Sequence, residues 1–275
     1  MRNIDERTVA GFGDEWQTYP QDRVPDPELA EFFDRYFHVF PWDRLPPGAV
    51  GFDLGCGSGR WDRFVAPRVG HLHCIDASAG ALEVARATLA HLDNCSFHHA
   101  AVDEIPLADG SMDFGFSLGV LHHVPDTARG LASCVAKLKR GAPFLVYLYY
   151  AFDNRPAWFR AVWHASDLVR QGVCRLPHSL KLPLTRALAA GVYWPLARTA
   201  RLVERSGRDA SSFPLYAYRD SSFYSMQTDA LDRFGTRLER RFTREEMGAM
   251  MRESGLVDIT FSERLPFWCA VGYRA

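Results

Sequence analysis

The sequence lacks the features that mark several large classes of protein. Its 275 residues contain no internal repeat, no low-complexity tract and no uninterrupted apolar run long enough to cross a bilayer. The 32 basic residues nearly balance the 33 acidic ones, so nucleic acid is not an expected partner. The charged residues Asp5, Glu6 and Arg7 lie close to the first residue, where a secretory signal would have an apolar core. They therefore favour a cytoplasmic protein.

Cysteine is scarce and scattered. No two cysteines have the C-x-x-C spacing, and no group of cysteine and histidine has the spacing of a zinc site, so we expect no bound metal. Several of the thiols lie in apolar runs, where a free cysteine behaves as a small hydrophobic residue and suits a reducing compartment. Apolar residues make up 47% of the chain and charged residues 24%, as is ordinary for a globular protein.

The most informative stretch runs from Val50 to Trp61, with the sequence V-G-F-D-L-G-C-G-S-G-R-W. Its apolar start predicts a buried strand, three alternate glycines follow, and residues 60–68 are compatible with a helix. A strand, a glycine turn and a helix make up a nucleotide-binding unit. The dinucleotide fingerprint requires G-x-G-x-x-G, whereas the third glycine here comes one residue earlier, which disfavours a nicotinamide-dependent dehydrogenase.

The run D-L-G-C-G-S-G resembles the first motif of class I S-adenosylmethionine (SAM)-dependent methyltransferases. The resemblance implies that SAM is the cofactor and that the residues of this loop hold it. Glycine is suited to such a loop because the backbone turns tightly and a ligand approaches closely. The residues implied in the loop are Asp53, Gly55, Cys56, Gly57 and Gly59.

Two acidic residues further along the chain extend the resemblance. Asp76 ends a predicted strand at residues 71–76 and is followed by Ala77, and the family places the SAM ribose at this position. The alternative is that Asp76 caps the helix predicted from residue 79. Val102 and Asp103 follow a strand at residues 96–100, and the family places the adenine beside such a pair. The alternative for Asp103 is a solvated acid in a loop.

The segment from Gly119 to Asp126 resembles the L-H-H-V-x-D run of ubiquinone and menaquinone methyltransferases. It follows a strand predicted at residues 114–118, so the resemblance places Leu118, Gly119 and His123 beside the cofactor. An imidazole titrates near neutral pH, which makes His122 and His123 candidates for the base that takes a proton from the acceptor. The alternative is that both histidines line the cofactor or hold the loop.

The order of elements predicts an α/β fold of the Rossmann-like type. A fifth strand is expected at residues 143–150, a helix at 243–254, and two further strands at 257–262 and 267–273. We therefore expect a seven-stranded, mostly parallel sheet with helices on both faces, and the resemblance implies an antiparallel last strand. Residues 48–150 and 241–275 would form the SAM-binding core, and residues 1–47 an N-terminal arm and helix.

The N-terminal arm carries an island of aromatic residues, Phe12, Trp16 and Tyr19, in an otherwise polar stretch. A short amphipathic turn is expected there, and a helix at residues 28–40. The resemblance suggests that the arm folds over the cofactor site, which would bring Trp16 and Tyr19 to the acceptor. A packed tail is the alternative.

Residues 151–240 do not belong to the minimal fold and predict a helical cap inserted after the fifth strand, with helices at 157–171, 178–193 and 194–205. The segment has 14 basic and 8 acidic residues, a formal charge of +6, against −7 for the rest of the chain. A basic cap suits an anionic acceptor, whereas the alternative is that the arginines form the solvated faces of amphipathic helices.

Tryptophan and arginine alternate with apolar residues in W-F-R-A-V-W and Y-W-P-L-A-R, and such helices can lie in a membrane interface. The same pattern suits a homodimer contact or the buried core of a cap. Polar aromatic residues between 216 and 224, and a group just after the fifth strand, suit the binding of a polar ring compound. The acceptor candidates outside the arm are Tyr149, Tyr150, Asn154, Tyr216, Tyr218, Arg219, Asp220 and Tyr224.

Together these features predict a SAM-dependent methyltransferase that modifies an oxygen or nitrogen of a small polar acceptor, such as a sugar, a glycan or a secondary metabolite. Two alternatives stay open. One is a methyltransferase for a lipid or quinone acceptor held in a membrane, and the other is a SAM-binding regulatory protein without turnover.

Overall fold

The computed structural model describes residues 2–275, and the chain divides into two units. The first comprises the chain up to Gln21, together with Glu31–Ala151 and Leu238–Ala275. The second comprises Asp22–Ala30 and Phe152–Arg237. The first unit holds the whole sheet, and the second contains helices.

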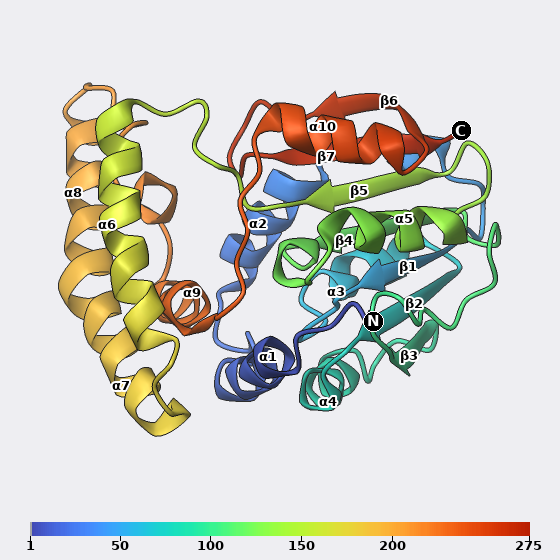
Figure 1. The fold of residues 1–275 in the computed structure, drawn as a ribbon, viewed down its shortest axis with the longest axis horizontal. Helices are drawn as coiled ribbons and strands as arrows, with labels where there is room; N and C mark the ends of the chain where they lie inside the picture. The colour runs from blue at the N-terminus through green and yellow to red at the C-terminus, as the bar shows by residue number, and fades with distance from the viewer. Residues whose placement is uncertain (1) are drawn as a thin grey trace. The chain divides into compact units, whose positions relative to one another are not determined.

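A seven-stranded sheet forms the centre of the first unit (Figure 1). Its strands follow the order β3-β2-β1-β4-β5-β7-β6, with parallel pairing from β3 to β5 and antiparallel pairing of β7 with both neighbours. This confirms the predicted Rossmann-like class and the antiparallel last strand. The strands are β1 (Val50–Leu54), β2 (His71–Asp76), β3 (Cys95–His99), β4 (Phe114–Leu118), β5 (Pro143–Tyr147), β6 (Leu256–Phe261) and β7 (Cys269–Arg274).

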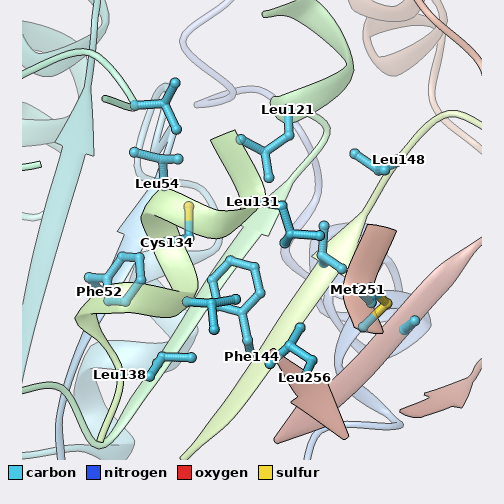
Figure 2. Close-up of a cluster of buried hydrophobic side chains, with 14 of the residues drawn as sticks. Phe52, Leu54, Leu121, Leu131, Cys134, Leu138, Phe144, Leu148, Met251 and Leu256 are labelled. Atoms are coloured by element: carbon cyan, nitrogen blue, oxygen red, sulfur yellow. The ribbon is translucent and has the colours of Figure 1, made fainter. Parts of the chain in front are cut away.

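Helices cover both faces of this sheet. Side chains of α5 and α10 pack with Phe52 of β1 and Phe144 of β5 in one buried cluster (Figure 2). On the opposite face, Phe37 of α2 lies 5.3 Å from Phe116 of β4, measured between ring centroids. The helices that contribute to this unit are α1 (Glu6–Thr18), α2 (Asp26–Phe37), α3 (Asp62–Val65), α4 (Ala79–Thr88), α5 (Thr127–Lys137) and α10 (Arg244–Glu253), with short 3₁₀ turns at Trp42–Arg44, Ala66–Arg68 and Leu121–His123.

Two strand glycines make room for aromatic rings at the centre of the sheet. A Cβ on Gly51 of β1 would lie 2.3 Å from the ring of Phe114, and a Cβ on Gly115 of β4 would lie 2.4 Å from the ring of Phe52. In the register of the two strands, Gly51 pairs with Phe114 and Phe52 pairs with Gly115. Each ring therefore covers the glycine beside it, and any larger residue would force the strands apart.

Three expectations about local structure are wrong. The arm forms a full helix, α1, which begins at an Asp5 side chain that accepts from the Thr8 amide, whereas only a short turn was expected. The expected fifth strand ends at Tyr147, three residues early. Residues Phe223–Gly235 form a helix, α9, in a stretch where no helix was expected. Local pattern did not predict α9 because polar residues mask its apolar side.

The second unit is built from helices around a small core of its own. It contains α6 (Ala157–Val173), α7 (His178–Leu188), a π-helical segment (Ala189–Tyr193), α8 (Trp194–Arg205), a 3₁₀ turn (Tyr216–Tyr218) and α9. Tyr193, Ala197 and Met226 are among the buried residues of this core. The π-helical segment lies just before Pro195, whose missing N–H interrupts the regular hydrogen bonding of the helix.

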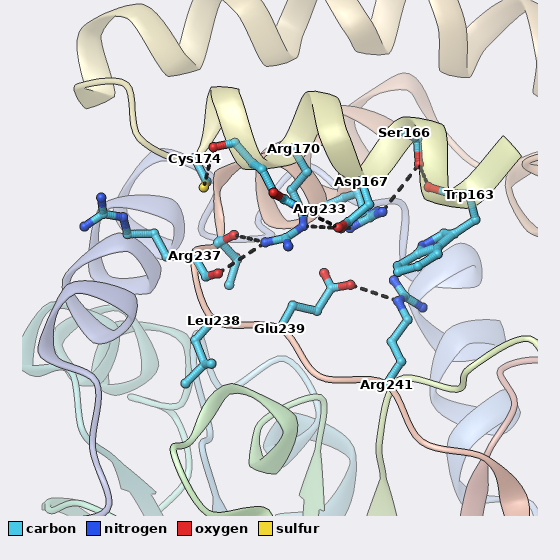
Figure 3. A network of polar contacts seen from close by, with 12 residues as sticks. Trp163, Ser166, Asp167, Arg170, Cys174, Arg233, Arg237, Leu238, Glu239 and Arg241 are labelled. Atoms are coloured by element: carbon cyan, nitrogen blue, oxygen red, sulfur yellow. Dashed lines mark hydrogen bonds and ion pairs between the residues drawn. The ribbon is translucent and has the colours of Figure 1, made fainter. Parts of the chain in front are cut away.

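A buried arginine ties α6 to the end of α9 (Figure 3). The Arg170 guanidinium pairs with Asp167 at 2.6 Å and donates to the backbone oxygens of Thr236 and Arg237. Arg233 of α9 lies 3.6 Å from the same Asp167 carboxylate. The guanidinium of Arg170 thus donates to backbone carbonyls at the C-terminus of α9, which have no partner within the helix. Within residues 2–275, no helix is both long and apolar enough to span a membrane.

Candidate functional site

The glycine loop after β1 is a backbone turn tied to the end of β2. Gly55, Gly57 and Gly59 all have positive φ angles, of 85°, 54° and 74°. The amides of Gly55 and Cys56 both donate to the oxygen of Ile75. A Cβ on Gly55 would lie 2.2 Å from the Val120 side chain, so only glycine fits there. The loop therefore lies at the carboxyl ends of the parallel strands, where α/β sheets bind ligands.

Asp76 joins this loop to the one that follows β2. One oxygen of its carboxylate accepts from the Gly57 amide at 2.9 Å, and the other accepts from the Ser78 amide at 2.8 Å. Burial raises the pKa of Asp76, and these two hydrogen bonds oppose the rise. The helix cap considered as an alternative role belongs to Ser78, whose side chain accepts from the Ala81 amide. Asp76 is thus held at the mouth of the loop with lone pairs remaining on both oxygens.

Asp103 presents a buried oxygen that has no hydrogen-bond partner among residues 2–275. Its other oxygen accepts from the Asn3 amide at 2.8 Å and lies 3.1 Å from the guanidinium of Arg129. Asn3 also bonds through its side chain to the backbone of Asp126. The start of the chain therefore fixes Asp103, while one carboxylate oxygen is left for a ligand. Val102, beside it, is buried.

Helix α1 lies over the glycine loop. A Cβ on Gly57 would meet the indole of Trp16 at 2.8 Å, and the guanidinium of Arg60 lies 5.2 Å from the indole centroid. Phe12, one turn earlier, lies 4.9 Å from the ring of His123. Tyr19 is buried at the end of the helix. The arm is thus packed against the residues predicted to hold the cofactor, and the part that Trp16 and Tyr19 play toward an acceptor stays a prediction.

His122 and His123 differ in environment although they are adjacent. His122 is completely buried, stacks on Tyr149 with ring centroids 3.8 Å apart, and neither ring nitrogen has a hydrogen-bond partner within residues 2–275. Burial, and then the nearby charges of His123 and Arg241, hold the pKa of His122 well below its usual range. The Nδ1 atom of His123 donates to the oxygen of Leu238 at 2.6 Å, which leaves the lone pair of the neutral ring on Nε2.

A buried ion pair next to these rings was not predicted from the sequence. Arg241 lies 2.8 Å from the carboxylate of Glu239, whose side chain is only 2% exposed, and 5.0 Å from the ring centroid of Tyr149. Arg241 also donates to the oxygen of Tyr150. Glu239 lies at the end of the predicted insertion and Arg241 just after it, and the sequence pattern there gives no signal that they return to the end of β5.

A second set of residues missed by sequence reasoning lies beneath the glycine loop. Asp53 of β1 and Asp62 of α3 are almost completely buried, and their carboxyl groups lie within hydrogen-bonding reach of each other. Burial raises the pKa of Asp62 to about 7, and burial together with the charge of Asp62 raises the pKa of Asp53 well above its ordinary range. Two carboxylates can only accept, so a proton held between them supplies the missing donor.

The other acceptor candidates lie in the second unit. Arg219 pairs with Glu204 at 2.6 Å, the hydroxyl of Tyr216 donates to the same carboxylate, and Asp220 lies 3.1 Å from Arg201. The hydroxyl of Tyr218 donates to Asp229 of α9. These contacts fix the 3₁₀ turn to α8 and α9. Asn154 is exposed before α6, and Tyr224 lies in the first turn of α9. The role of this group in binding an acceptor stays a prediction.

Comparison with known proteins bears on the first unit. Residues 52–146 match the model of the methyltransferase domain family, and this range contains the glycine loop, Asp76, Asp103 and both histidines. The chain contains a class I SAM-dependent methyltransferase domain. Its cofactor is S-adenosyl-L-methionine. The resemblance that the motifs suggested is therefore confirmed.

Curated relatives match the same part of the chain. Phosphoethanolamine N-methyltransferase 2 of Caenorhabditis elegans is 31% identical over 106 residues, which are 38% of this chain and 24% of that protein. The ubiquinone biosynthesis O-methyltransferase of Aromatoleum aromaticum is 34% identical over 120 residues, 43% of this chain and 50% of that protein. The chain thus spans half or less of the length of these two relatives.

Solved structures share the fold at low identity. One is a chain in the complex between the Haloferax volcanii Trm112 methyltransferase activator and a methyltransferase, with a TM-score of 0.52, 16% identity and coverage of 99% of this chain and 98% of that one. Another is the CurJ carbon methyltransferase, with a TM-score of 0.54, 12% identity and coverage of 96% and 59%.

The residues of the methyltransferase domain fit SAM. The unpartnered oxygen of Asp103 suits an exocyclic amine, and the lone pairs of Asp76 suit ribose hydroxyls. Apart from the proton between them, Asp53 and Asp62 leave buried oxygens without hydrogen-bond partners among residues 2–275, and these suit a ligand that carries an ammonium group. At Gly57, the lack of a side chain lets the indole of Trp16 pack within 2.8 Å of where a Cβ would lie, so an aromatic ring covers the backbone of the loop. Residues 2–275 contain no group of side chains suited to a metal ion.

Proposed function

We propose that this protein transfers a methyl group from SAM to an oxygen or nitrogen of a small polar acceptor. The observation that carries the proposal is the Asp76 carboxylate at the end of β2, which accepts from the glycine loop through one oxygen and from the Ser78 amide through the other, at the edge of the sheet where the histidines also lie. SAM supplies a methyl group that is already activated by its bond to a sulfonium. The protein then needs to align donor and acceptor and to remove a proton from the acceptor.

We propose that Nε2 of His123 is the base that takes the proton from the acceptor. The hydrogen bond from Nδ1 to the oxygen of Leu238 orients the ring and also stabilises the imidazolium that forms when Nε2 takes a proton. His122 is less suited to this task because burial and the charge of Arg241 disfavour its protonated form. Its role in this proposal is to position the acceptor from its stack on Tyr149.

Substitutions of the two histidines separate these roles. His123→Asn should lower the maximal rate by about 100-fold or more, since a positioned base contributes about 10²–10⁴ in rate. His122→Asn should mainly raise the KM for the acceptor. SAM affinity measured by calorimetry should stay within a factor of about three for both variants, which controls for folding. An equal rate for His123→Asn and the parent across the pH range would contradict the assignment of the base.

The proposed activity itself is tested with radiolabelled SAM. Calorimetry should show one SAM bound per chain and no binding of NAD, and incubation with a fraction of small molecules from cell extract should transfer the label to a product. Mass spectrometry of that product then identifies the acceptor and the attacking atom. SAM binding without label transfer to any fraction, lipid extracts included, would favour a regulatory SAM-binding protein instead.

A further inference from the structure

The second unit exposes an unusual share of large apolar side chains. Among residues 2–275, ten large apolar residues are exposed, and nine of them lie on α6, α7, α8 or the π-helical segment between the last two. Leu168 is 70% exposed, Leu202 65% and Trp158 50%. Single exposed apolar residues need no explanation, but a group confined to three successive helices marks a surface that meets another molecule.

Apart from Arg160, His164 and Gln171, the exposed residues of α6 are apolar and form a stripe along the helix. They are spaced three or four residues apart, so they share one side, and Gly172 at the end of the stripe has open space above it. The other side of the helix carries Asp167, Arg170 and Val173, which are directed to the contacts with α9. The stripe consists of Trp158, Ala161, Val162, Ala165, Leu168, Val169 and Gly172.

The continuous helical stretch from α7 to α8 carries a second stripe. Its buried side contributes Ala189, Tyr193 and Ala197 to the core of the second unit. Its exposed side is apolar over most of its length and again follows a helical spacing. The exposed residues are Leu180, Leu184, Ala187, Gly191, Trp194, Pro195 and Leu202. Neither stripe is covered by another described part of the second unit.

The charge of these helices is strongly one-sided. Residues 157–205 contain eight basic and two acidic residues. Both acids are engaged in ion pairs, Asp167 with Arg170 and Glu204 with Arg219. Arg160, Arg175 and Arg205 are exposed, and none of the exposed residues in this range is acidic. The apolar stripes are thus bordered by positive charge that the second unit does not neutralise.

We propose that the exposed face of α6, α7 and α8 docks on a membrane surface that carries acidic phospholipid headgroups. Amphipathic helices with tryptophan and leucine on one side and arginine beside them lie in the plane of such an interface, held by apolar burial and by attraction to anionic lipid. A second copy of the chain fits less well, because a symmetric dimer would place like charges against each other. The helices rest on the bilayer, since none is suited to cross it. This inference does not depend on methyl transfer.

Co-sedimentation of the full chain with vesicles tests the proposal. Vesicles of phosphatidylcholine mixed with phosphatidylglycerol should bind at least about tenfold more protein than vesicles of phosphatidylcholine alone, and added salt should reduce the difference. The double variant Val162→Gln/Leu168→Gln should lose about tenfold of this binding. Its matched control is Val257→Gln, which changes an exposed apolar residue of the first unit and should bind as the parent does.

A charge variant gives an independent measurement. Arg160→Gln/Arg175→Gln/Arg205→Gln should lower binding to acidic vesicles by about tenfold and leave binding to neutral vesicles unchanged. Arg7→Gln/Arg140→Gln/Arg252→Gln removes the same charge from exposed positions of the first unit and should have little effect. Circular dichroism and SAM binding verify that every variant is folded.

Two results would overturn the proposal. One is binding to acidic vesicles that is no greater than to neutral vesicles, or that survives both sets of substitutions on α6–α8. The other is a dimer in light scattering that Val162→Gln/Leu168→Gln converts to a monomer, which would identify the stripes as a contact between copies.

Discussion

Asp76→Asn should weaken SAM binding by about 30–150-fold, equivalent to about 2–3 kcal/mol, because a carboxylate contributes about that much through its charged hydrogen bonds. Both oxygens of Asp76 accept backbone amides, from Gly57 and Ser78. The asparagine amide nitrogen can only donate, so it would face one of these N–H groups and displace its loop. The variant therefore loses the oxygen that accepts hydrogen bonds from the ribose hydroxyls, and the glycine loop also changes its conformation.

Calorimetric titration of SAM into the variant measures this effect. Asp109→Asn is the matched control, since Asp109 is an exposed acid of the same unit that lies before β4 and is paired with Lys137 at 2.7 Å. It should bind SAM as the parent does. Unchanged SAM affinity in Asp76→Asn would remove the basis for the cofactor site described here and for the proposed activity.

Asp62→Asn should stabilise the folded protein at high pH. Burial raises the pKa of Asp62 to about 7, so the folded protein holds a proton there that the unfolded chain releases near its ordinary pKa. The contribution of Asp62 to the free energy of unfolding is therefore fully present below its unfolded pKa. The folded protein loses this stability as the pH rises through about 7. Asparagine cannot ionise, and it can donate to Asp53 at every pH. The variant should gain about 2–4 kcal/mol at pH 8, and the gain should shrink toward zero near pH 4.

Urea unfolding at a series of pH values measures the difference between the two proteins. Asp93→Asn, at an exposed position after α4, should follow the parent at every pH. A variant that is less stable than the parent at pH 8 would contradict the prediction, because it would show that the ionised Asp62 carboxylate is stabilised by a partner in the folded protein. The same variant should bind SAM less tightly if the pair contacts the ammonium group, which calorimetry at pH 8 would reveal.

Much of the first unit could be predicted because its signals are local. The apolar runs at Phe52, Phe116 and Phe144 correspond to buried strands, and the capping box of Thr243 and Glu246 is present at the start of α10. The residues predicted to hold the cofactor follow strand ends, and parallel strands bring those ends to one edge.

The errors arose where the outcome depended on distant partners. Helix α1 is stabilised by packing against the loops after β1 and β2, with Trp16 on Gly57 and Gly13 beside Ser78, contacts that a local pattern does not reveal. Asp62 looked like an ordinary residue of a surface helix, and only the packing of α3 against β1 brings its carboxyl to Asp53. Arg241 reaches Tyr149, and Glu239 pairs with Arg241, because residues around Phe242 run beside the segment that follows β5.

By itself the sequence determined the parallel sheet, the glycine loop and its cofactor. Glycines at positive φ angles, buried strands and acidic residues at strand ends each have a pattern that can be recognised within a few consecutive residues. The tertiary structure alone decided that the carboxyl groups of Asp53 and Asp62 are buried beside each other, that His122 has no hydrogen-bond partner among residues 2–275 while His123 is oriented by Leu238, and that apolar stripes on α6–α8 face outward. These depend on the free energy of bringing together groups far apart in the chain, which packing sets and local pattern does not encode.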